Sequence, residues 1–483
     1  PGVWAYPLTS PSSNFYQNTN YRYNSNGGVY NQSSKLTDYS SFTRGDIIGT
    51  ALDMDNGKVY FSKNGVWQNS GNPATQTNPA ATGLTGTWVF GASTNGNDTI
   101  LQANFGATAF AYTAPSGFKA LNTANMSEAT ISDGSDYFDT LLWTGDGASS
   151  TRVITGLSME NAPDWIWAKE RNGGSSHALF DAVRGFGSNN VLKTNSSDAE
   201  AGSNGGYINS TSATSITWAQ GTSSAEFYDL NNKTYVAWCW DAGSSTVTNT
   251  DGTISSQVRA SQTSGVSIVK YTGNGSSSAT VGHGLNAQLK MLIHKRLDDV
   301  GSWKIKHTSL STNHQLLFDT AASVDVTGNH GGGMADLSSS STFGFAQGLT
   351  NVDNVNGNGP SYINICFSEI PGFSAFGSYT GNGSSDGVYV HTGFRPALVL
   401  QKRSDSAGHE WSIHDSTREP SNDVGLYLEP STSNAEQDGN RRDFLSNGFK
   451  LRTSSPGVNA SGGTYIWAAF AENPFQSNGG LAF

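Results

Sequence analysis

The sequence contains few charged residues: Asp, Glu, Lys and Arg make up 13% of its 483 residues, roughly half the share in an average soluble protein. The formal net charge is −11, and the 27 Lys and Arg residues are scattered singly. A nucleic-acid groove needs clustered basic side chains that neutralise phosphates. We therefore expect no nucleic-acid partner.

Long apolar runs and cysteines are also scarce. No run approaches the roughly eighteen residues needed to span a bilayer, so we expect no membrane segment. With Cys numbering 2, the chain is not a disulfide scaffold. It starts at Pro1 with neither an initiator Met nor a signal peptide, and we expect it to begin inside a longer polypeptide.

Aromatic residues and glycine are abundant instead, with 12 Trp, 18 Tyr, 23 Phe and 57 Gly. Each large aromatic side chain can bury roughly 150–250 Å², which is enough apolar area to exclude a disordered chain. Short β-branched and aromatic runs alternate with Gly, Asn and Ser turns, and no amphipathic segment of helical length stands out. This pattern predicts an all-β protein built from β-sandwiches.

One unit occurs three times after residue 136, at a spacing of about ninety residues between its first and last landmarks. Each copy opens with an aromatic-Thr-Gly-Asp/Asn-Gly box, continues with an apolar stretch ending near a basic pair, and closes on a strand-like segment that starts with Tyr. The boxes are Trp143–Gly147, Tyr271–Gly275 and Tyr379–Gly383; the apolar stretches are Trp165–Arg171, Leu292–Arg296 and Leu398–Arg403; the closing segments are Tyr235–Trp240, Tyr362–Phe367 and Tyr465–Phe470.

The repeat predicts four β-domains in a row: residues 1–126, then three related sandwiches at 137–242, 258–370 and 373–475. We expect the closing Tyr residues to occupy the same strand in each copy. Cys239 and Cys366 occupy equivalent places, where the third copy has Ala469. Substitution by Ala indicates a small buried core position for both cysteines and argues against a disulfide.

Residues 45–106 carry the clearest local pattern. An alternating strand over 45–55 meets Asn56-Gly57, a favoured two-residue hairpin turn, and a second strand covers 58–63. Trp67 and Trp88 lie in strand-like runs beside apolar residues. We expect both to be core residues, whose replacement by Ala would cost about 3–5 kcal/mol.

The order G-D-x-I-G-x-A-L-D-x-D-x-G-x-x-x-F-x-x-N-G-x-W, then W-x-F, then N-F-G in residues 45–106 resembles the second half of a SPRY (B30.2-type) β-sandwich. The resemblance implies a binding module without catalytic chemistry. It also implies that residues 1–44 hold only the last strand or two of the first half. The strands near 47–53 and 59–63 should then be paired on both sides, or capped by upstream residues or another chain.

The segment 110–125 and the three-copy region are similar to parts of structural proteins from tailed bacteriophages. This similarity implies a tail fibre, tail appendage or capsid-attached fibre in the virion, outside the cell, with other virion subunits as partners. A homotrimer is expected by analogy with phage fibres.

Two glycine-containing patterns could suggest ligand sites. Asp53, Asp55 and Gly57 begin like a calcium loop, but Gly57 and Asn64 stand where the EF-hand requires a ligand and a Glu. The three boxes could suggest a phosphate loop, but no Gly-Lys-Ser/Thr follows them. Tight turns explain both patterns better.

The repeat also aligns polar and aromatic residues. His177, Trp303 and Trp411 follow the repeated lysine Lys169, Lys295 or Lys402, and Asp181, His307 and Asp415 align four positions later. Asp181 and Asp415 each precede an Arg by three residues, Arg184 and Arg418, whereas the second copy has Leu310. We favour a buried Asp–Arg brace over a sugar-binding carboxylate.

No motif assigns a catalytic, cofactor or metal site, and we expect no cofactor. The nine His residues show no H-E-x-x-H pattern; His330–Gly333 and His409–Trp411 are expected at the surface. No G-x-S-x-G elbow occurs. Carboxylates from distant strands could still meet in a glycosidase site, which leaves a polysaccharide depolymerase open.

The function that this sequence predicts is non-enzymatic, structural and adhesive: loop tips would contact a host-surface glycan or protein, weakly at each site and more strongly through repetition. Ligand-binding residues are not assigned. The alternatives are the depolymerase, a purely architectural virion subunit and a bacterial surface adhesin.

Overall fold

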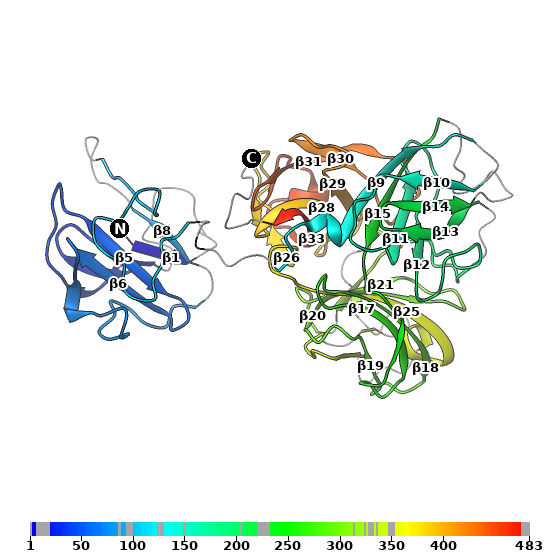
Figure 1. The fold of residues 1–483 in the computed structure, drawn as a ribbon, viewed down its shortest axis with the longest axis horizontal. Helices are drawn as coiled ribbons and strands as arrows, with labels where there is room; N and C mark the ends of the chain where they lie inside the picture. Colours follow the sequence, from blue (N-terminus) through cyan, green and yellow to red (C-terminus); the bar gives the residue numbers. More distant parts are fainter. Residues whose placement is uncertain are drawn as a thin grey trace. The chain divides into compact units, whose positions relative to one another are not determined.

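The computed structural model divides into two compact units, residues 1–127 and 128–483 (Figure 1). It describes residues 2–5, 20–85, 88–92, 100–122, 125, 130–147, 151–201, 205–219, 232–312, 314–322, 325–326, 333–334, 337–345 and 353–474. Both units are built from antiparallel sheets, so the expected all-β class is confirmed. Among the described residues no helix has the length and apolar character needed to cross a membrane.

The N-terminal unit contains two sheets. The larger has the order β4-β3-β2-β1-β8, with β1 at Gly2–Ala5, β2 at Asn20–Tyr23, β3 at Gly28–Asn31, β4 at Ser34–Asp38 and β8 at Trp88–Gly91. The smaller has the order β5-β6-β7, formed by Ile48–Asp53, Lys58–Lys63 and Val66–Trp67. Val3, Tyr23, Val29, Val59 and Phe61 form the core between them.

The described residues between 2 and 44 contain four strands, β1 to β4, and so exceed the one or two that the resemblance implied. Their Ser, Asn and Tyr-rich composition hid short strands of four or five residues. Strand β6 is paired on both sides, whereas β5 pairs only with β6 in the described part of the chain. The expectation of two-sided pairing therefore holds for β6 alone.

The two Asn-Gly turns differ. Asp53 pairs with Lys58, so the β5–β6 loop has four residues and not the expected two; the Asp53 carboxylate accepts hydrogen bonds from the backbone and side-chain nitrogens of Asn56. The β6–β7 turn is the two-residue hairpin, since Asn64 and Gly65 have φ values of 48° and 79°. Such a pair of positive φ values is the type I′ geometry that Asn-Gly favours.

Trp67 and Trp88 are half-buried and not fully buried, so the prediction that both are core residues holds only in part: Trp88 packs against the core. Trp88 packs at the margin of the core and stacks on Tyr21 with ring centroids 5.7 Å apart, while its indole nitrogen donates to the Thr85 carbonyl at 2.9 Å. Each residue lies on a strand, β7 or β8, that is at the edge of its sheet in the described part of the chain.

The C-terminal unit contains the three repeats, and each repeat builds one main sheet with the same strand order. The strand that carries the Thr-Gly-Asp/Asn-Gly box pairs with the closing strand. On its other side, the closing strand pairs with the strand that carries the basic pair, and that strand pairs with one further strand. In the first repeat these strands are β9 (Phe138–Thr144), β15 (Thr234–Trp240), β11 (Trp165–Glu170) and β12 (Ala178–Asp181); in the second, β18 (Val266–Asn274), β25 (Asn358–Ser368), β20 (Leu289–Arg296) and β21 (Lys304–His307); in the third, β26 (Ser374–Thr380), β33 (Thr464–Pro474), β28 (Phe394–Arg403) and β29 (Ser412–Asp415).

The second main sheet is extended at both edges. Strands β16 (Val247–Asn249) and β17 (Ser256–Ser261) lie beyond β18, and β22 (His314–Leu317) and β23 (Asp325–Val326) lie beyond β21. The expected domain start at residue 258 therefore falls inside β17. A Ser- and Thr-rich connection hid this strand from the sequence pattern.

The register confirms that the closing Tyr residues are equivalent. Each pairs with its box aromatic: Trp143 with Tyr235, Tyr271 with Tyr362 and Tyr379 with Tyr465. The rings stack at 5.1, 5.1 and 4.9 Å between centroids. Four residues farther along the closing strands, Cys239, Cys366 and Ala469 are each 0% exposed, as expected for a small core position.

A smaller sheet covers one face of each main sheet and completes three sandwiches. These sheets are β10 (Arg152–Thr155), β14 (Ser215–Ala219) and β13 (Tyr207–Ser212) in the first repeat; β19 (Thr280–Gly282) and β24 (Thr342–Gly344) in the second; and β27 (Tyr389–His391), β32 (Gly448–Leu451), β31 (Gln437–Leu445) and β30 (Val424–Tyr427) in the third.

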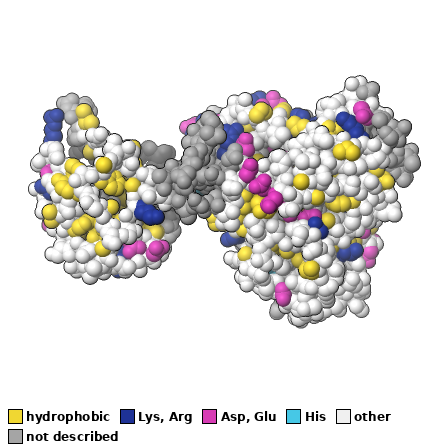
Figure 2. Space-filling model, viewed as in Figure 1, with side chains coloured by type: hydrophobic (Ala, Val, Ile, Leu, Met, Phe, Trp, Pro, Cys, Tyr) yellow, Lys and Arg dark blue, Asp and Glu magenta, His cyan; other side chains and the backbone are white. Residues whose placement is uncertain are grey.

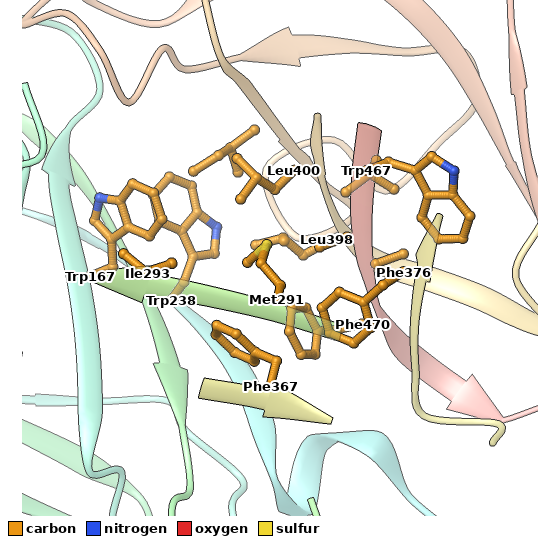
Figure 3. Packing of buried hydrophobic residues seen from close by; sticks show 14 of the residues in the cluster. Trp167, Trp238, Met291, Ile293, Phe367, Phe376, Leu398, Leu400, Trp467 and Phe470 are labelled. Carbon is orange, nitrogen blue, oxygen red and sulfur yellow. The ribbon is translucent and has the colours of Figure 1, made fainter. Parts of the chain in front are cut away.

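The opposite faces of the three main sheets pack against one another in one shared apolar core, here called the hub (Figure 3). Trp167 and Trp238 come from the first repeat, Met291 and Phe367 from the second, and Leu400 and Phe470 from the third. At the centre is a void lined only by apolar side chains. Because strands in a sheet alternate their side chains between two faces, each main sheet serves its own sandwich and the hub simultaneously.

The three repeats are thus one compact unit and not separate domains in a row. Two-sided burial explains this difference. The basic-pair strand Trp165–Glu170 is buried at all six positions, and so are the closing segments Tyr235–Trp240 and Tyr362–Phe367. A free sandwich would expose one of these faces to water.

Candidate functional site

The three repeats contact one another in a cycle through residues that the sequence aligned. His177 hydrogen-bonds to the Glu429 carbonyl at 3.1 Å, Trp303 donates to the Lys193 carbonyl at 2.8 Å, and Trp411 donates to the Leu317 carbonyl at 2.9 Å. The first repeat therefore contacts the third, the second contacts the first, and the third contacts the second. These side chains hold the hub together.

The hub position of Trp411 corrects one expectation. Trp411 is 1% exposed, so the segment His409–Trp411 is not simply a surface feature, although His409 and Glu410 are half-buried. Residues 330–332 of the other expected surface segment, His330–Gly333, lie outside the described residues. Trp411 immediately precedes β29 (Ser412–Asp415) and packs in the hub together with Ile413 of that strand.

The three repeated lysines are buried, and Lys295 also reaches the first repeat by donating to the Ser197 carbonyl at 3.2 Å. Lys169, Lys295 and Lys402 are each 0% exposed. Their ammonium groups donate to backbone carbonyls, those of Glu170 at 2.6 Å, Arg296 at 2.9 Å and Arg403 at 2.9 Å. Burial lowers the pKa of each to about 8. The lysines satisfy strand carbonyls and have no access to a substrate.

The aligned Asp–Arg pairs form the predicted buried brace. Arg184 contacts Asp181, and Arg418 contacts Asp415, and all four side chains are no more than 2% exposed. Each Arg also reaches a glutamate, Glu200 at 2.7 Å or Glu436 at 2.8 Å. The second repeat replaces the Asp with His307, whose Nδ1 accepts from the Ser309 backbone nitrogen at 3.0 Å.

The box glycines act as turn residues, as expected. Gly147, Gly275 and Gly383 have φ values of 70°, 75° and 68°, which L-residues with side chains seldom adopt. In the second and third repeats a buried asparagine clamps the box: Asn356 accepts from the Asn274 backbone nitrogen at 3.1 Å, and Asn459 from that of Asn382 at 2.9 Å.

These clamping asparagines end two short helices, α1 (Asp353–Asn356) and α2 (Pro456–Asn459). The sequence reasoning missed them because four-residue helices leave no periodicity to detect. An Asn six residues before the closing Tyr in both repeats was the available signal.

The box tips are the surface feature that the three repeats share. In every copy the aromatic and the first glycine are buried, whereas Thr and Asp or Asn are exposed: Thr144 and Asp146, Thr272 and Asn274, Thr380 and Asn382. Hydroxyl and amide or carboxylate groups can donate and accept hydrogen bonds with a polar ligand.

The interior of the third sandwich contains a polar cluster that the sequence reasoning also missed, here called the Arg442 cluster. Its members Arg442, Gln401, His414, Ser412 and Trp467 are buried between the two sheets. Arg442 donates to Gln401 at 2.8 Å. Burial lowers the pKa of Arg442 to about 10. These residues are distant in sequence, and only the pairing of strands within the two facing sheets shows that they share the sandwich interior.

Among the described residues, no group of three His, Cys, Asp or Glu side chains is arranged to hold a metal ion. Asp53 is engaged within its own turn and contributes to no such group. Two features of the described residues offer polar groups to a ligand: the exposed box tips and the buried Arg442 cluster.

Comparison with known proteins identifies one family. A family described as a domain of unknown function (DUF7483) matches residues 133–474, and the chain belongs to it. The matched range includes all three repeats and lies within the C-terminal unit, which agrees with the shared core. No curated protein and no solved structure matches. The SPRY and phage resemblances stay predictions.

Proposed function

We propose that this family member is a non-enzymatic structural and adhesive protein of a bacteriophage virion, which presents loops to a host-surface glycan or protein. One observation carries the proposal: a box tip with an exposed Thr and an exposed Asp or Asn recurs three times on one compact unit. Repeated weak sites on a common body raise overall affinity without any new contact at each site.

The hub supports this role because it keeps the three sandwiches together. Each sandwich shares its main sheet with the hub, so the repeats cannot separate without exposing apolar surface. A body of this kind suits sustained attachment. Catalysis would instead require one cleft with convergent reactive groups.

The N-terminal unit supports contact with other virion subunits. Ile47 and Val66 are 46% and 67% exposed, and β5 has one unpaired edge in the described part of the chain. Figure 2 shows hydrophobic side chains distributed over the visible face of this unit. Exposed apolar residues beside a strand edge favour pairing with another chain. A homotrimer is part of the proposal, and light scattering on the purified chain would test it.

Adhesion is tested by binding of the purified chain to an array of bacterial surface glycans. We expect saturable binding that weakens stepwise as Thr144→Val, Thr272→Val and Thr380→Val are combined. Thr155→Val, at an exposed position outside the boxes, should leave binding unchanged. Equal binding by the triple variant and the wild type would exclude the box tips as contacts.

Catalysis and location are tested separately. Incubation with the bound polysaccharide should release no new reducing ends; sustained release, lost on changing one carboxylate, would establish a depolymerase. Antibodies against the chain should label assembled particles in electron micrographs of a phage lysate. Labelling of cell envelopes alone would favour the bacterial adhesin, and labelled particles without glycan binding would favour a purely architectural subunit.

A further inference from the structure

The Arg442 cluster contains several buried polar atoms without a hydrogen-bond partner among the described residues, including Ser412 Oγ and both His414 ring nitrogens. The Arg442 Nε, Gln401 Nε2 and Trp467 Nε1 atoms are buried and have no hydrogen-bond partner among the described residues. The orientation of the Gln401 amide follows from its partners, because its oxygen accepts from Arg442 at 2.8 Å and from the Tyr379 hydroxyl at 3.3 Å. Its nitrogen therefore remains a donor.

The donors come from the two sheets of the third sandwich. Trp467, Gln401 and Ser412 are direct neighbours across β33, β28 and β29, so their side chains share the sandwich face. Figure 3 shows Trp467 on the side of its strand away from the hub residues Leu398 and Leu400. Arg442 comes from the facing sheet and lies 5.8 Å from the Phe449 ring, which Trp467 also contacts at 5.8 Å.

The cluster also has an uncompensated positive charge. Arg442 is 0% exposed, and its hydrogen bonds go to a neutral amide and to the Asn440 carbonyl. In the described chain no carboxylate lies within ion-pair distance of it, whereas the equally buried Arg418 contacts both Asp415 and Glu436. A buried charge without a partner is strongly unfavourable.

We propose that the interior of the third sandwich binds a small monovalent inorganic anion of the chloride type, held by Arg442, Gln401 and Trp467. An anion beside Arg442 would accept from its unpaired Nε and neutralise the guanidinium. A water molecule would satisfy some of the donors but would leave the charge in place. The first sandwich serves as the internal comparison, because Ala168 and Ala237 occupy the positions of Gln401 and Trp467.

Crystals of the chain grown in sodium bromide provide the direct test, since bromide scatters anomalously. We expect one anomalous peak within hydrogen-bond distance of Arg442 Nε and Trp467 Nε1, and none inside the first sandwich. A feature there without anomalous signal, or an empty site, would overturn the proposal.

A solution test uses Gln401→Glu, which places a carboxylate beside Arg442 and removes the need for an external anion. At constant ionic strength, with gluconate replacing chloride, the folding equilibrium constant of the wild type should rise about tenfold per tenfold increase in chloride above the dissociation constant. That dependence should vanish in Gln401→Glu and persist in Arg441→Gln, which changes an exposed neighbour. An unchanged dependence in Gln401→Glu would contradict the assignment.

Discussion

The buried ion pair between Asp181 and Arg184 in the first repeat can be tested by mutation. The second repeat, which lacks the pair, indicates the compensating substitutions. Arg184→Leu removes the cation that contacts Asp181 and Glu200. Asp181 is then left as a buried carboxylate that retains only two backbone donors, Val183 at 3.0 Å and the residue 184 nitrogen at 2.9 Å. Removing one partner of a buried ion pair leaves the other charge buried without a counter-ion. We therefore expect the free energy of unfolding to fall by about 3–5 kcal/mol.

The second repeat shows how the fold manages without the pair. There, His307 and Leu310 occupy the two positions, and the imidazole Nδ1 accepts the backbone hydrogen bond that the Asp would accept. Introducing both residues, as Asp181→His with Arg184→Leu, removes the unpaired carboxylate charge. The imidazole of the new His keeps an acceptor for the backbone hydrogen bond. We therefore expect the double variant to recover at least about 2 kcal/mol relative to Arg184→Leu alone, within the range of couplings measured between contacting residues.

The assay is equilibrium unfolding in urea, followed by tryptophan fluorescence, with the slope against denaturant as a check on two-state behaviour. Arg441→Leu, at a side chain that is 40% exposed, is the matched control and should cost no more than about 1 kcal/mol. The explanation fails if Arg184→Leu lies within about 1 kcal/mol of the wild type, or if the double variant is as unstable as the single one.

Three further predictions concern the same unit. Leu400→Ala should cost about 2–5 kcal/mol and lower a single unfolding transition of all three repeats, because Leu400 lies in the shared hub; calorimetry that resolves three transitions would contradict a common core. Acid should destabilise the fold between pH 6.5 and 4, because burial lowers the pKa of His283, His294 and His307 to about 4. The unfolded chain therefore binds protons at a higher pH than the folded chain does. Each His removes up to about 3 kcal/mol from the free energy of unfolding as the pH falls. Unfolding curves at pH 7 and pH 4.5 with equal midpoints would refute this. Cys366→Ala should lower the free energy of unfolding by at most about 1–2 kcal/mol, since the third repeat has Ala469 at the equivalent position. The Cys366 thiol should react with a thiol reagent only on unfolding, because burial raises its pKa.

The sequence alone determined the features that depend on local pattern and on repetition. Alternating aromatic and β-branched runs with Gly and Asn turns specify strands by a period of two residues. The equivalence of Tyr235, Tyr362 and Tyr465 and the alignment of Asp181, His307 and Asp415 follow from spacing, because equal spacing in a repeat places residues at equal points of the register.

Only the tertiary structure decided which faces meet. The pattern of a strand buried on both sides indicates that something covers it but not what does, so the hub that joins the three sandwiches could not be read from the chain. The Arg442 cluster is another example: Gln401, Ser412 and Trp467 are distant in sequence, and strand pairing brings them together. Trp67 and Trp88 are a further example, because each lies on a strand at a sheet edge and is half-buried. Burial of a strand residue depends on neighbouring strands, which cannot be identified from the local sequence.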